Sequence, residues 1–315
     1  MALYPTMLVF RKAESNYGKS VSERTIEEKL RKGVFILDKP PGPSSHEAAA
    51  FVRKLLGLKK AGHSGTLDAN VSGVLPVFLE EATKAVRYFL GERKKYVCVM
   101  RLNERKSESE IEEAFSHFRG KIYQKPPLAS AVAKKLRVRE VFSLNVLEIE
   151  GKDVLFECDV EGGFYVRKLC TDVGEVLGCG AEMFELRRVY AAGFTEAKAH
   201  SLQDLSDAFW LWKEKGNAKE LDGMVLNLEE ALENALKKVV VDDGAIKPIS
   251  TGANLAIPGI VALDDFISKD EAVQVLSGKG EIICFARALH SSKEIVAMEK
   301  QGKGGLAFDI ERVVL

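Results

Sequence analysis

The sequence predicts an α+β protein made of two domains, and three observations lead to this prediction. A chain of 315 residues is long enough to bury two cores. Up to about residue 235, short apolar runs typical of strands alternate with helical patterns. From residue 239 onward the sequence has short strands, many glycines and little helix. We therefore expect an N-terminal extension over residues 1–32, a first domain over 33–235, and a second domain over 236–315 on which the N-terminal strand can pack.

Composition narrows the class of protein further. The formal net charge is zero, so no global basic field argues for nucleic acid, although a local patch still can. The five cysteines form neither a CxxC pair nor a Cys/His metal spacing, which indicates buried thiols in a reducing compartment. No apolar run approaches the length of a membrane span, and the N-terminus lacks a signal-peptide pattern. The expected location is the cytoplasm.

The first elements are a short strand, a short helix and a strand–turn–helix unit. Residues 8–10 are either a strand added to a domain elsewhere or a frayed terminus. Thr25 opens a capping box, which predicts the start of a helix. A buried strand over residues 34–37 runs into the rigid turn Asp38–Pro43, and a second capping box then opens a helix that ends at Gly57. By residue type alone, the lysine in this turn is expected to be solvated.

The stretch over residues 62–78, GHSGTLDANVSGVLPVF, holds the strongest candidate for a functional residue. Its glycines permit positive φ angles and close backbone approach, so the loop can hold a tight shape around Asp68. The apolar run Val74–Leu79 is a buried strand or a helix start that anchors the loop in a core. A carboxylate held there is expected to be partly desolvated and tuned by a partner. By residue type alone, an Asp that closes a turn is the commoner case, and a catalytic Asp is the alternative.

Helices and strands continue to alternate after this loop, and Tyr96 lies near the start of the next strand. By residue type alone, Tyr96 is a half-buried strand residue. The second domain contains a hairpin around Gly278-Lys-Gly280. The expected elements are helices over residues 80–92, 111–118, 201–215 and 226–236, and strands over 94–100, 141–150, 154–160, 272–276 and 281–289.

Two spans without an acidic residue run through the first domain, over residues 48–67 and 115–139. A charge run is usually a solvated face, but two such spans in a net-neutral chain favour contact with a phosphate backbone. The second span also contains an aromatic residue and a Pro-Pro turn, which suits RNA. The lysines expected to contact RNA are Lys59, Lys60, Lys125 and Lys134.

These motifs resemble those of the TruB/dyskerin family of RNA pseudouridine synthases. GHSGTLD followed by an apolar run is similar to the family's central motif, whose Asp is catalytic, which implies that Asp68 is the catalytic residue. The next residue is commonly Pro in the family and is Ala69 here, a change that softens the loop but leaves the carboxylate in place. The turn DKPPGPSSHE resembles the family's first motif, which implies that Lys39 and Pro40 brace the active-site loop, in which Gly65 supports the shape.

Further motifs imply the rest of the site. Lys-x-Tyr resembles the motif whose Tyr lines the site against the target base, which implies Tyr96. Gly-Phe-Tyr-Val-Arg resembles the motif whose Arg pairs with the catalytic Asp, which implies Arg167. The resemblance also implies that His63 helps to hold the flipped nucleotide and that Leu186 lines the site. The alternatives are strand packing for the tyrosine, a helix-start arginine, a structural loop histidine and a core leucine.

Residues 251–260, TGANLAIPGI, resemble the signature of the PUA domain, a small β-barrel-like RNA-binding module. This resemblance implies close approach of an RNA backbone at Gly252 and Gly259. A generic β appendage is the alternative. The fold implied for the whole chain is α+β, with a mixed, largely antiparallel-sheet catalytic domain followed by a PUA domain.

The resemblance implies isomerisation of uridine to pseudouridine in RNA. Neither a cofactor nor a metal is expected, because the reaction involves no redox chemistry and no hydrolysis. The motifs and the N-terminal extension are most similar to the archaeal box H/ACA branch, which implies ribosomal RNA as substrate, and a guide RNA and small accessory ribonucleoprotein subunits as partners. The alternatives are a stand-alone enzyme acting on transfer RNA and a non-catalytic RNA-binding scaffold. No membrane partner is expected.

Overall fold

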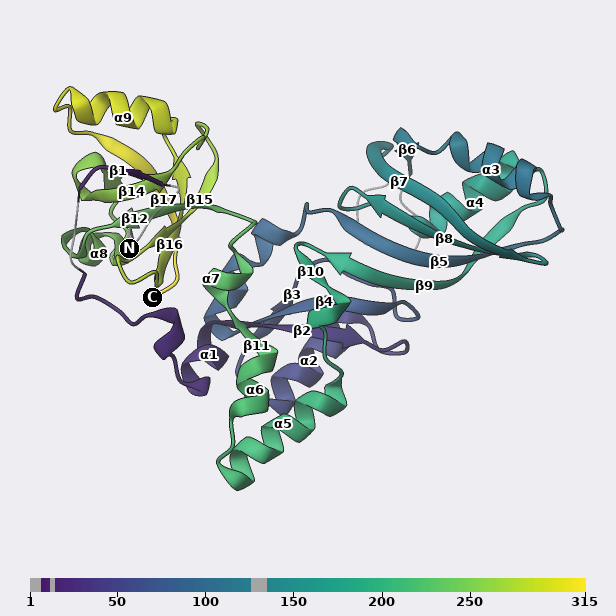
Figure 1. The fold of residues 1–315 in the computed structure, drawn as a ribbon, viewed down its shortest axis with the longest axis horizontal. Coiled ribbons are helices and arrows are strands. Elements are labelled where there is room, and N and C mark those ends of the chain that lie inside the picture. The colour runs from purple at the N-terminus through teal and green to yellow at the C-terminus, as the bar shows by residue number, and fades with distance from the viewer. Residues whose placement is uncertain (1–6, 12–14, 126–134) are drawn as a thin grey trace. The chain divides into compact units, whose positions relative to one another are not determined.

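The computed structural model describes residues 7–11, 15–125 and 135–315, and the chain divides into two compact units (Figure 1). We call residues 1–34, 79–85 and 225–315 the terminal unit, and residues 35–78 and 86–224 the central unit. Residues 225–235 thus group with the terminal unit. One reason is that the buried amide of Gln274 donates hydrogen bonds to the carbonyls of Leu232 and Leu236, at 3.3 and 2.9 Å.

A mixed, largely antiparallel sheet forms the central unit, which confirms the predicted fold class. Its strands follow the order β2-β4-β9-β5-β8-β7-β6. The central strand β5 pairs antiparallel with both β8 and β9, whereas β4 pairs parallel with β9. The strands predicted over residues 141–150 and 154–160 are β7 and β8, which pair as a hairpin around Gly151. The strands are β2 (Gly33–Lys39), β3 (Ala61–His63), β4 (Ser72–Leu79), β5 (Lys94–Leu102), β6 (Gly120–Gln124), β7 (Arg137–Glu150), β8 (Asp153–Val160), β9 (Ala181–Ala191) and β10 (Phe194–Thr195).

Helices of the central unit bury their apolar stripes against this sheet. Phe115 of α3 meets Phe156 of β8 edge to face, with ring centroids 5.2 Å apart. Helix α4 buries Leu169 and Val173, one turn apart, and this orientation leaves Arg167 at the surface. Figure 1 shows α3 and α4 together beside the sheet. The helices are α2 (Ser45–Leu55), α3 (Glu108–Ser116), α4 (Val166–Val176), η3 (Glu196–Lys198), α5 (Leu202–Lys215) and α6 (Lys219–Met224).

The terminal unit is built on a second sheet, with the strand order β1-β14-β12-β15-β16-β17-β13. The N-terminal strand β1 pairs antiparallel with β14, with Leu8 opposite Leu263, so the strand alternative for residues 8–10 is the correct one. The predicted hairpin around residues 278–280 is formed by β15 and β16. The elements are β1 (Met7–Val9), η1 (Val21–Glu23), α1 (Ile26–Lys32), β11 (Val225–Asn227), α7 (Leu228–Ala231), β12 (Lys237–Val241), α8 (Asp243–Ser250), β13 (Leu255–Ala256), η4 (Ile257–Gly259), β14 (Ile260–Asp264), β15 (Ala272–Leu276), β16 (Ile282–Ala288), α9 (Ser292–Lys300) and β17 (Leu306–Val313).

Three expectations about local structure are corrected. Residues 226–236 are not one helix: strand β11 precedes the single turn α7, because Asn227 caps a helix start there and Leu232 ends it. Residues 80–92 contain the 3₁₀ helix η2 (Glu80–Phe89) rather than an α-helix. Its first residue, Glu80, has φ +43°, a left-handed conformation that cannot belong to a right-handed α-helix. The region after residue 239 also contains more helix than expected, in α8 and α9.

None of the helices in the described parts of the chain has the length and apolar content needed to cross a bilayer.

Candidate active site

The loop between β3 and β4 presents Asp68 to solvent. Its neighbours Leu67 and Val71 are 4 % and 2 % exposed and anchor the loop in the core of the central unit. The Asp68 side chain is 56 % exposed, so the expectation of a partly desolvated carboxylate is wrong for this structure. The physical reason is the anchoring itself, since inward-pointing Leu67 and Val71 leave residues 68–70 on the outside. An exposed carboxylate on a fixed loop is accessible to a ligand.

Three buried polar side chains hold the loop backbone at every second residue around Asp68. Arg188 Nη2 donates to the carbonyl of Gly65 at 3.0 Å. Ser45 Oγ donates to the carbonyl of Leu67 at 3.0 Å and accepts from the Leu67 amide at 2.8 Å. Lys39 Nζ donates to the carbonyl of Ala69 at 3.0 Å. These bonds fix the loop on both sides of Asp68.

Lys39 joins the Asp38–Pro43 turn to the Asp68 loop. Its ammonium also donates to the carbonyls of Pro40 and Pro43, at 2.8 and 2.7 Å. The side chain is fully buried, so the expectation of a solvated lysine from residue type alone is wrong. The physical reason is that three carbonyls replace its water shell. Burial lowers the pKa of Lys39, and nearby Arg188 lowers it further.

The carboxylate of Asp68 forms an ion pair with Arg167 Nη2, across 99 residues of sequence. Arg167 lies in the first turn of α4, whose start is held by the buried side chain of Gln124. Gln124 Nε2 donates to the Tyr165 carbonyl at 3.1 Å, and its Oε1 accepts from the Tyr165 amide at 2.9 Å. The structure therefore brings Asp68 and Arg167 together, with the loop and the helix each fixed through the backbone.

The other residues of the predicted site lie on neighbouring strands. Tyr96 of β5 is 7 % exposed, and burial is the main reason that its pKa is raised. Leu186 of β9 is buried opposite Cys98 and belongs to the core cluster of the central unit. The His63 ring packs edge-on against His46, with centroids 5.9 Å apart, and burial lowers the pKa of His63. Pro40 is exposed beside the turn that Lys39 holds.

Two buried cations of this region were missed by sequence reasoning, Arg188 and Lys94. Arg188 is fully buried, and its Nε donates to the carbonyl of Val74 at 2.8 Å. Lys94 Nζ donates to the Glu92 carbonyl at 2.7 Å, and burial lowers the pKa of Lys94 to about 8. Both side chains lie against Gly65, where an added Cβ would lie 3.1 Å from Lys94 Cε and 3.3 Å from Arg188 Nη1. Gly65 also has φ +76°, so a larger residue there would strain the backbone as well as press on both cations.

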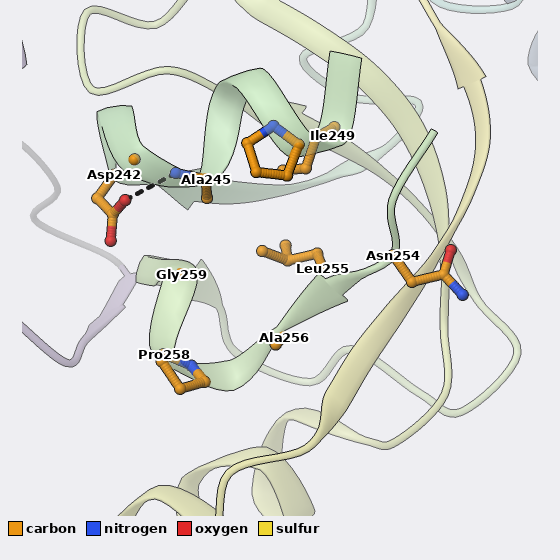
Figure 2. Close-up of a pocket in the computed structure, with 10 residues that line it drawn as sticks. Asp242, Ala245, Ile249, Asn254, Leu255, Ala256, Pro258 and Gly259 are labelled. Atoms are coloured by element: carbon orange, nitrogen blue, oxygen red, sulfur yellow. Dashed lines mark hydrogen bonds between the residues drawn. The ribbon is translucent and has the colours of Figure 1, made fainter. Parts of the chain in front are cut away.

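The residues expected to contact RNA are placed as follows. Lys59, Lys60 and Lys125 are exposed on the central unit, and Lys134 lies outside the described residues. In the terminal unit, Gly252 is exposed with φ +96°. Gly259 lines a cavity of about 320 Å³ between α8 and residues 254–259. Figure 2 shows this cavity, with the Asp242 carboxylate accepting a hydrogen bond from the Ala245 amide at 3.0 Å.

Comparison with known proteins accounts for nearly the whole chain. Models of four families match in succession: the DKCLD (NUC011) domain over residues 7–49, the N-terminal domain of TruB family pseudouridylate synthase over 53–166, the tRNA pseudouridylate synthase B C-terminal domain over 167–233, and the PUA domain over 237–314. The order of these domains is the order of the motifs in the sequence.

Two archaeal relatives are similar to this chain over most of their own length. A probable tRNA pseudouridine synthase B of Archaeoglobus fulgidus is 44 % identical over 96 % of this chain and 91 % of the relative. The protein of the same description from Methanocaldococcus jannaschii is 45 % identical over 98 % of this chain and 91 % of the relative.

Two solved structures are also similar to this chain over nearly its whole length. A chain from a Cbf5-Nop10-Gar1 complex matches with a TM-score of 0.89 and 41 % identity, covering 98 % of this chain and 94 % of that one. A chain from an H/ACA RNP bound to a substrate RNA containing 2'-deoxyuridine matches with a TM-score of 0.88 and 40 % identity, with the same coverage. The fold and these matches define an RNA pseudouridine synthase, an isomerase that acts on RNA. The chain belongs to the TruB family, and it carries a PUA domain.

Proposed function

We propose that this chain converts uridine to pseudouridine in ribosomal RNA as the catalytic subunit of a box H/ACA guide ribonucleoprotein, with Asp68 as the catalytic residue. The observation that carries the proposal is the ion pair of Asp68 with Arg167 on a loop fixed by three buried side chains. The similarity over 98 % of the chain to a Cbf5 complex supports the assembly.

The reaction is an isomerisation and is balanced without a co-reactant. The bond between N1 of uracil and C1' of ribose breaks, the base rotates, and C1' joins C5. The C5 hydrogen then leaves as a proton, and N1 gains one. Asp68 serves either as the nucleophile at C1' or as the base that deprotonates the ribose. Both routes require the nucleotide to leave its stack, and an Asp68 side chain that is 56 % exposed is accessible to it.

The neighbouring side chains have distinct roles in this proposal. The Arg167 guanidinium orients the Asp68 carboxylate before the substrate arrives. Tyr96 acts mainly through its hydroxyl at the final loss of the C5 proton, because only 7 % of the residue is exposed for stacking. His63 helps to hold the extruded nucleotide, and Leu186 forms part of the apolar lining.

RNA contacts extend beyond the reacting nucleotide. Exposed lysines of the central unit approach phosphates, and the terminal unit, as a PUA domain, binds RNA near the cavity at Gly259. The proposed partners are the guide RNA, the substrate RNA and small accessory subunits, because a Cbf5-Nop10-Gar1 complex and an H/ACA RNP are among the similar structures. The proposed location is the cytoplasm, in keeping with five free cysteines. The lysines in this proposal are Lys59, Lys60, Lys125 and Lys134, and the glycines are Gly252 and Gly259.

The test is Asp68→Asn, which keeps the size of the side chain and removes its charge. We expect formation of pseudouridine to vanish while the affinity for RNA stays within about threefold, because Asp68 acts on the bond and not on the phosphates. The matched control is Asp207→Asn, an exposed carboxyl on α5, which should retain wild-type turnover. Pseudouridine formation by Asp68→Asn at more than about a tenth of the wild-type rate would remove Asp68 from the mechanism.

A second candidate substrate is transfer RNA, because the archaeal relatives are described as probable tRNA pseudouridine synthases. Sequencing of the RNA that copurifies with the chain separates the two candidates. Guide RNAs among the recovered molecules, with modification of ribosomal RNA only after guide and accessory subunits are added, support the first candidate. Modification of a transfer-RNA transcript by the chain alone supports the second.

A further inference from the structure

Arg188 occupies the point of the central sheet where the strands of Tyr96 and of the Asp68 loop meet. On β9, Arg188 lies directly opposite Tyr96 of the antiparallel strand β5. On its other side, Arg188 lies beside Gly73 of the parallel strand β4. A Cβ at Gly73 would approach the Arg188 carbonyl to 2.2 Å, so the glycine allows this close contact. Residues directly opposite each other in an antiparallel pair project from the same face of the sheet, so Tyr96 and Arg188 are side-chain neighbours.

The guanidinium of Arg188 is bonded to backbone on one side only. Nε and Nη2 donate to the carbonyls of Val74 and Gly65, at 2.8 and 3.0 Å. Nη1 is buried and has no hydrogen-bond partner among the described residues. The side chain also interacts with the Tyr96 phenol, an interaction that favours the ionised phenol. Arg188 is therefore a fully buried cation without a carboxylate partner in the described parts of the chain, next to both the loop of Asp68 and the ring of Tyr96.

We propose that Arg188 is a positioning residue that links Tyr96 to the Asp68 loop and stabilises the negative charge that the Tyr96 oxygen carries before it accepts the C5 proton. This inference rests on the proposed function. In the final step the C5–H bond breaks, its electron pair restores the C5–C6 double bond, and the proton passes to the Tyr96 phenolate. That phenolate has first lost its own proton to solvent. A cation fixed beside the oxygen lowers the free energy of the phenolate, and its bond to Gly65 fixes the oxygen relative to the loop.

The surroundings explain why a buried cation is needed there. Burial raises the pKa of Tyr96, and the neighbouring Cys158 thiol and Asp68 carboxylate raise it further, whereas Arg188 acts in the opposite direction. The cations Lys39 and Lys94 and the ring of His63 also lie within the electrostatic reach of Arg188. Removing the charge of Arg188 should therefore raise the pH that is needed for Tyr96 to act as a base.

The experiment compares Arg188→Gln, which keeps hydrogen-bond donors but loses the charge, with Arg188→Lys, which keeps the charge. Two probes are offered to the full chain: a transfer-RNA transcript alone, and a box H/ACA guide and substrate RNA pair with accessory subunits. Single-turnover rates are then measured over pH 6 to pH 9, with uridine and with 5-deuterouridine, on the probe that the wild type modifies.

We expect Arg188→Gln to move the ascending limb of the pH–rate profile upward by about one unit, because a nearby charge shifts a pKa by that order. The rate ratio between protiated and deuterated RNA should rise by about twofold, because loss of the C5 proton becomes the slow step. Arg188→Lys should keep the ascending limb of the pH–rate profile, and the rate ratio between protiated and deuterated RNA, at their wild-type values. A residue that only supports the fold would lower the rate without changing either quantity.

The control is Arg187→Gln on the same strand, where the guanidinium is paired with Asp38 and Glu196 instead. It should keep the wild-type limb and isotope ratio. Equal profiles for Arg188→Gln, Arg188→Lys and the wild type would overturn the proposal. Should Arg188→Gln fail to fold, Arg188→His is used instead, because a neutral imidazole also lacks the charge. Its ascending limb should move upward, and an ascending limb at the wild-type pH would overturn the proposal.

Failure of this inference is distinguishable from failure of the proposed function. If neither probe is modified by the wild type, or if Asp68→Asn stays active, the proposed function fails. If Asp68→Asn is inactive while the Arg188 variants keep the wild-type limb and isotope ratio, only the role of Arg188 fails.

Discussion

Arg24 in the terminal unit and Arg188 in the central unit are both buried, yet their guanidinium groups meet different partners. Arg24 binds Glu229 through two parallel hydrogen bonds of 2.7 Å, and Glu281 lies 3.7 Å away. Arg188 meets carbonyls instead. The pKa of Arg24 is raised because its carboxylate partners outweigh burial, whereas burial lowers the pKa of Arg188. The first charge is neutralised, and the second is only solvated by backbone dipoles.

The lysines of the two regions repeat the contrast. Lys32 pairs with Glu281 at 3.0 Å in the terminal unit. Lys39 and Lys94, beside the Asp68 loop, donate to carbonyls, and burial lowers the pKa of both. Paired charges tie the N-terminal segment to its sheet and contribute to the fold. Cations without a carboxylate partner produce a positive potential beside Asp68, which is typical of a functional site.

The largest effect on stability is expected where a neutralised pair is broken. Arg24→Met leaves Glu229 buried without its cation, which should lower the free energy of unfolding by about 3–5 kcal/mol. Urea unfolding of the full chain measures it. The matched control is Arg11→Met, because Arg11 and Glu299 form an ion pair in which both side chains are 35 % exposed. Adding Glu229→Gln to Arg24→Met should restore part of the loss, and a larger loss in the double variant would contradict the pairing argument.

The second effect concerns the pH dependence of stability at Lys94. Its pKa is about 8 in the folded protein, against 10.5 for a free lysine. Between these pH values the unfolded chain binds more protons than the folded one, so the free energy of unfolding rises with pH. The rise due to Lys94 should be about 3 kcal/mol.

Urea unfolding of the wild type and of Lys94→Met, from pH 7 to pH 10.5, measures this contribution as a difference in slope. Lys95→Met is the control, because its side chain is 54 % exposed on the same strand. Parallel curves for the wild type and Lys94→Met would show that Lys94 is not held in a desolvated state.

The third effect is smaller and tests the contact between the cations and the loop. Gly65→Ala places a methyl group against Lys94 and Arg188 at a φ of +76°. We expect a loss of about 1–3 kcal/mol in the free energy of unfolding, with a fall in turnover. Gly57→Ala has a similar φ of +65° and open space around it, so it isolates the backbone strain. Equal losses and equal turnover in the two variants would mean that the cations do not confine Gly65.

The smallest effect on stability is expected at the ion pair of the site itself. The side chains of Arg167 and Asp68 are 47 % and 56 % exposed, so Arg167→Ala should change the free energy of unfolding by less than about 1 kcal/mol. Turnover should nevertheless fall by about 100-fold or more, because the carboxylate loses its orientation. Thermal unfolding and single-turnover rates measure the two quantities. Near-normal turnover would remove Arg167 from the site.

The site residues that lie in motifs could be predicted from the sequence, and so could the helices and strands that have a local pattern. The Asp68 loop, the strand of Tyr96 and the hairpin around Gly151 each have a local signal in glycines or apolar alternation. The exposure of Asp68 has no local signal in the sequence, because it depends on how Leu67 and Val71 pack into the core. For the same reason, the leucine spacing of residues 226–236 fits both a helix and the single turn observed.

The buried cations were missed because a charged residue in a strand is normally exposed. A signal was nevertheless present. On β5, Lys94 shares the alternating buried face with Tyr96 and Cys98. On β9, Arg188 follows Leu186 by two residues on the same buried face. A Lys or Arg in phase with an apolar alternation therefore identifies a candidate buried charge.

The hydrogen bonds that fix the Asp68 loop end on main-chain atoms, with a consequence for how the loop can vary. Lys39 Nζ and the Gly42 amide both donate to the oxygen of Ala69, a group that every residue type supplies. A network anchored in this way is indifferent to the side chain at that position. The loop can therefore carry alanine at this position, where proline is common in the family, without losing either hydrogen bond.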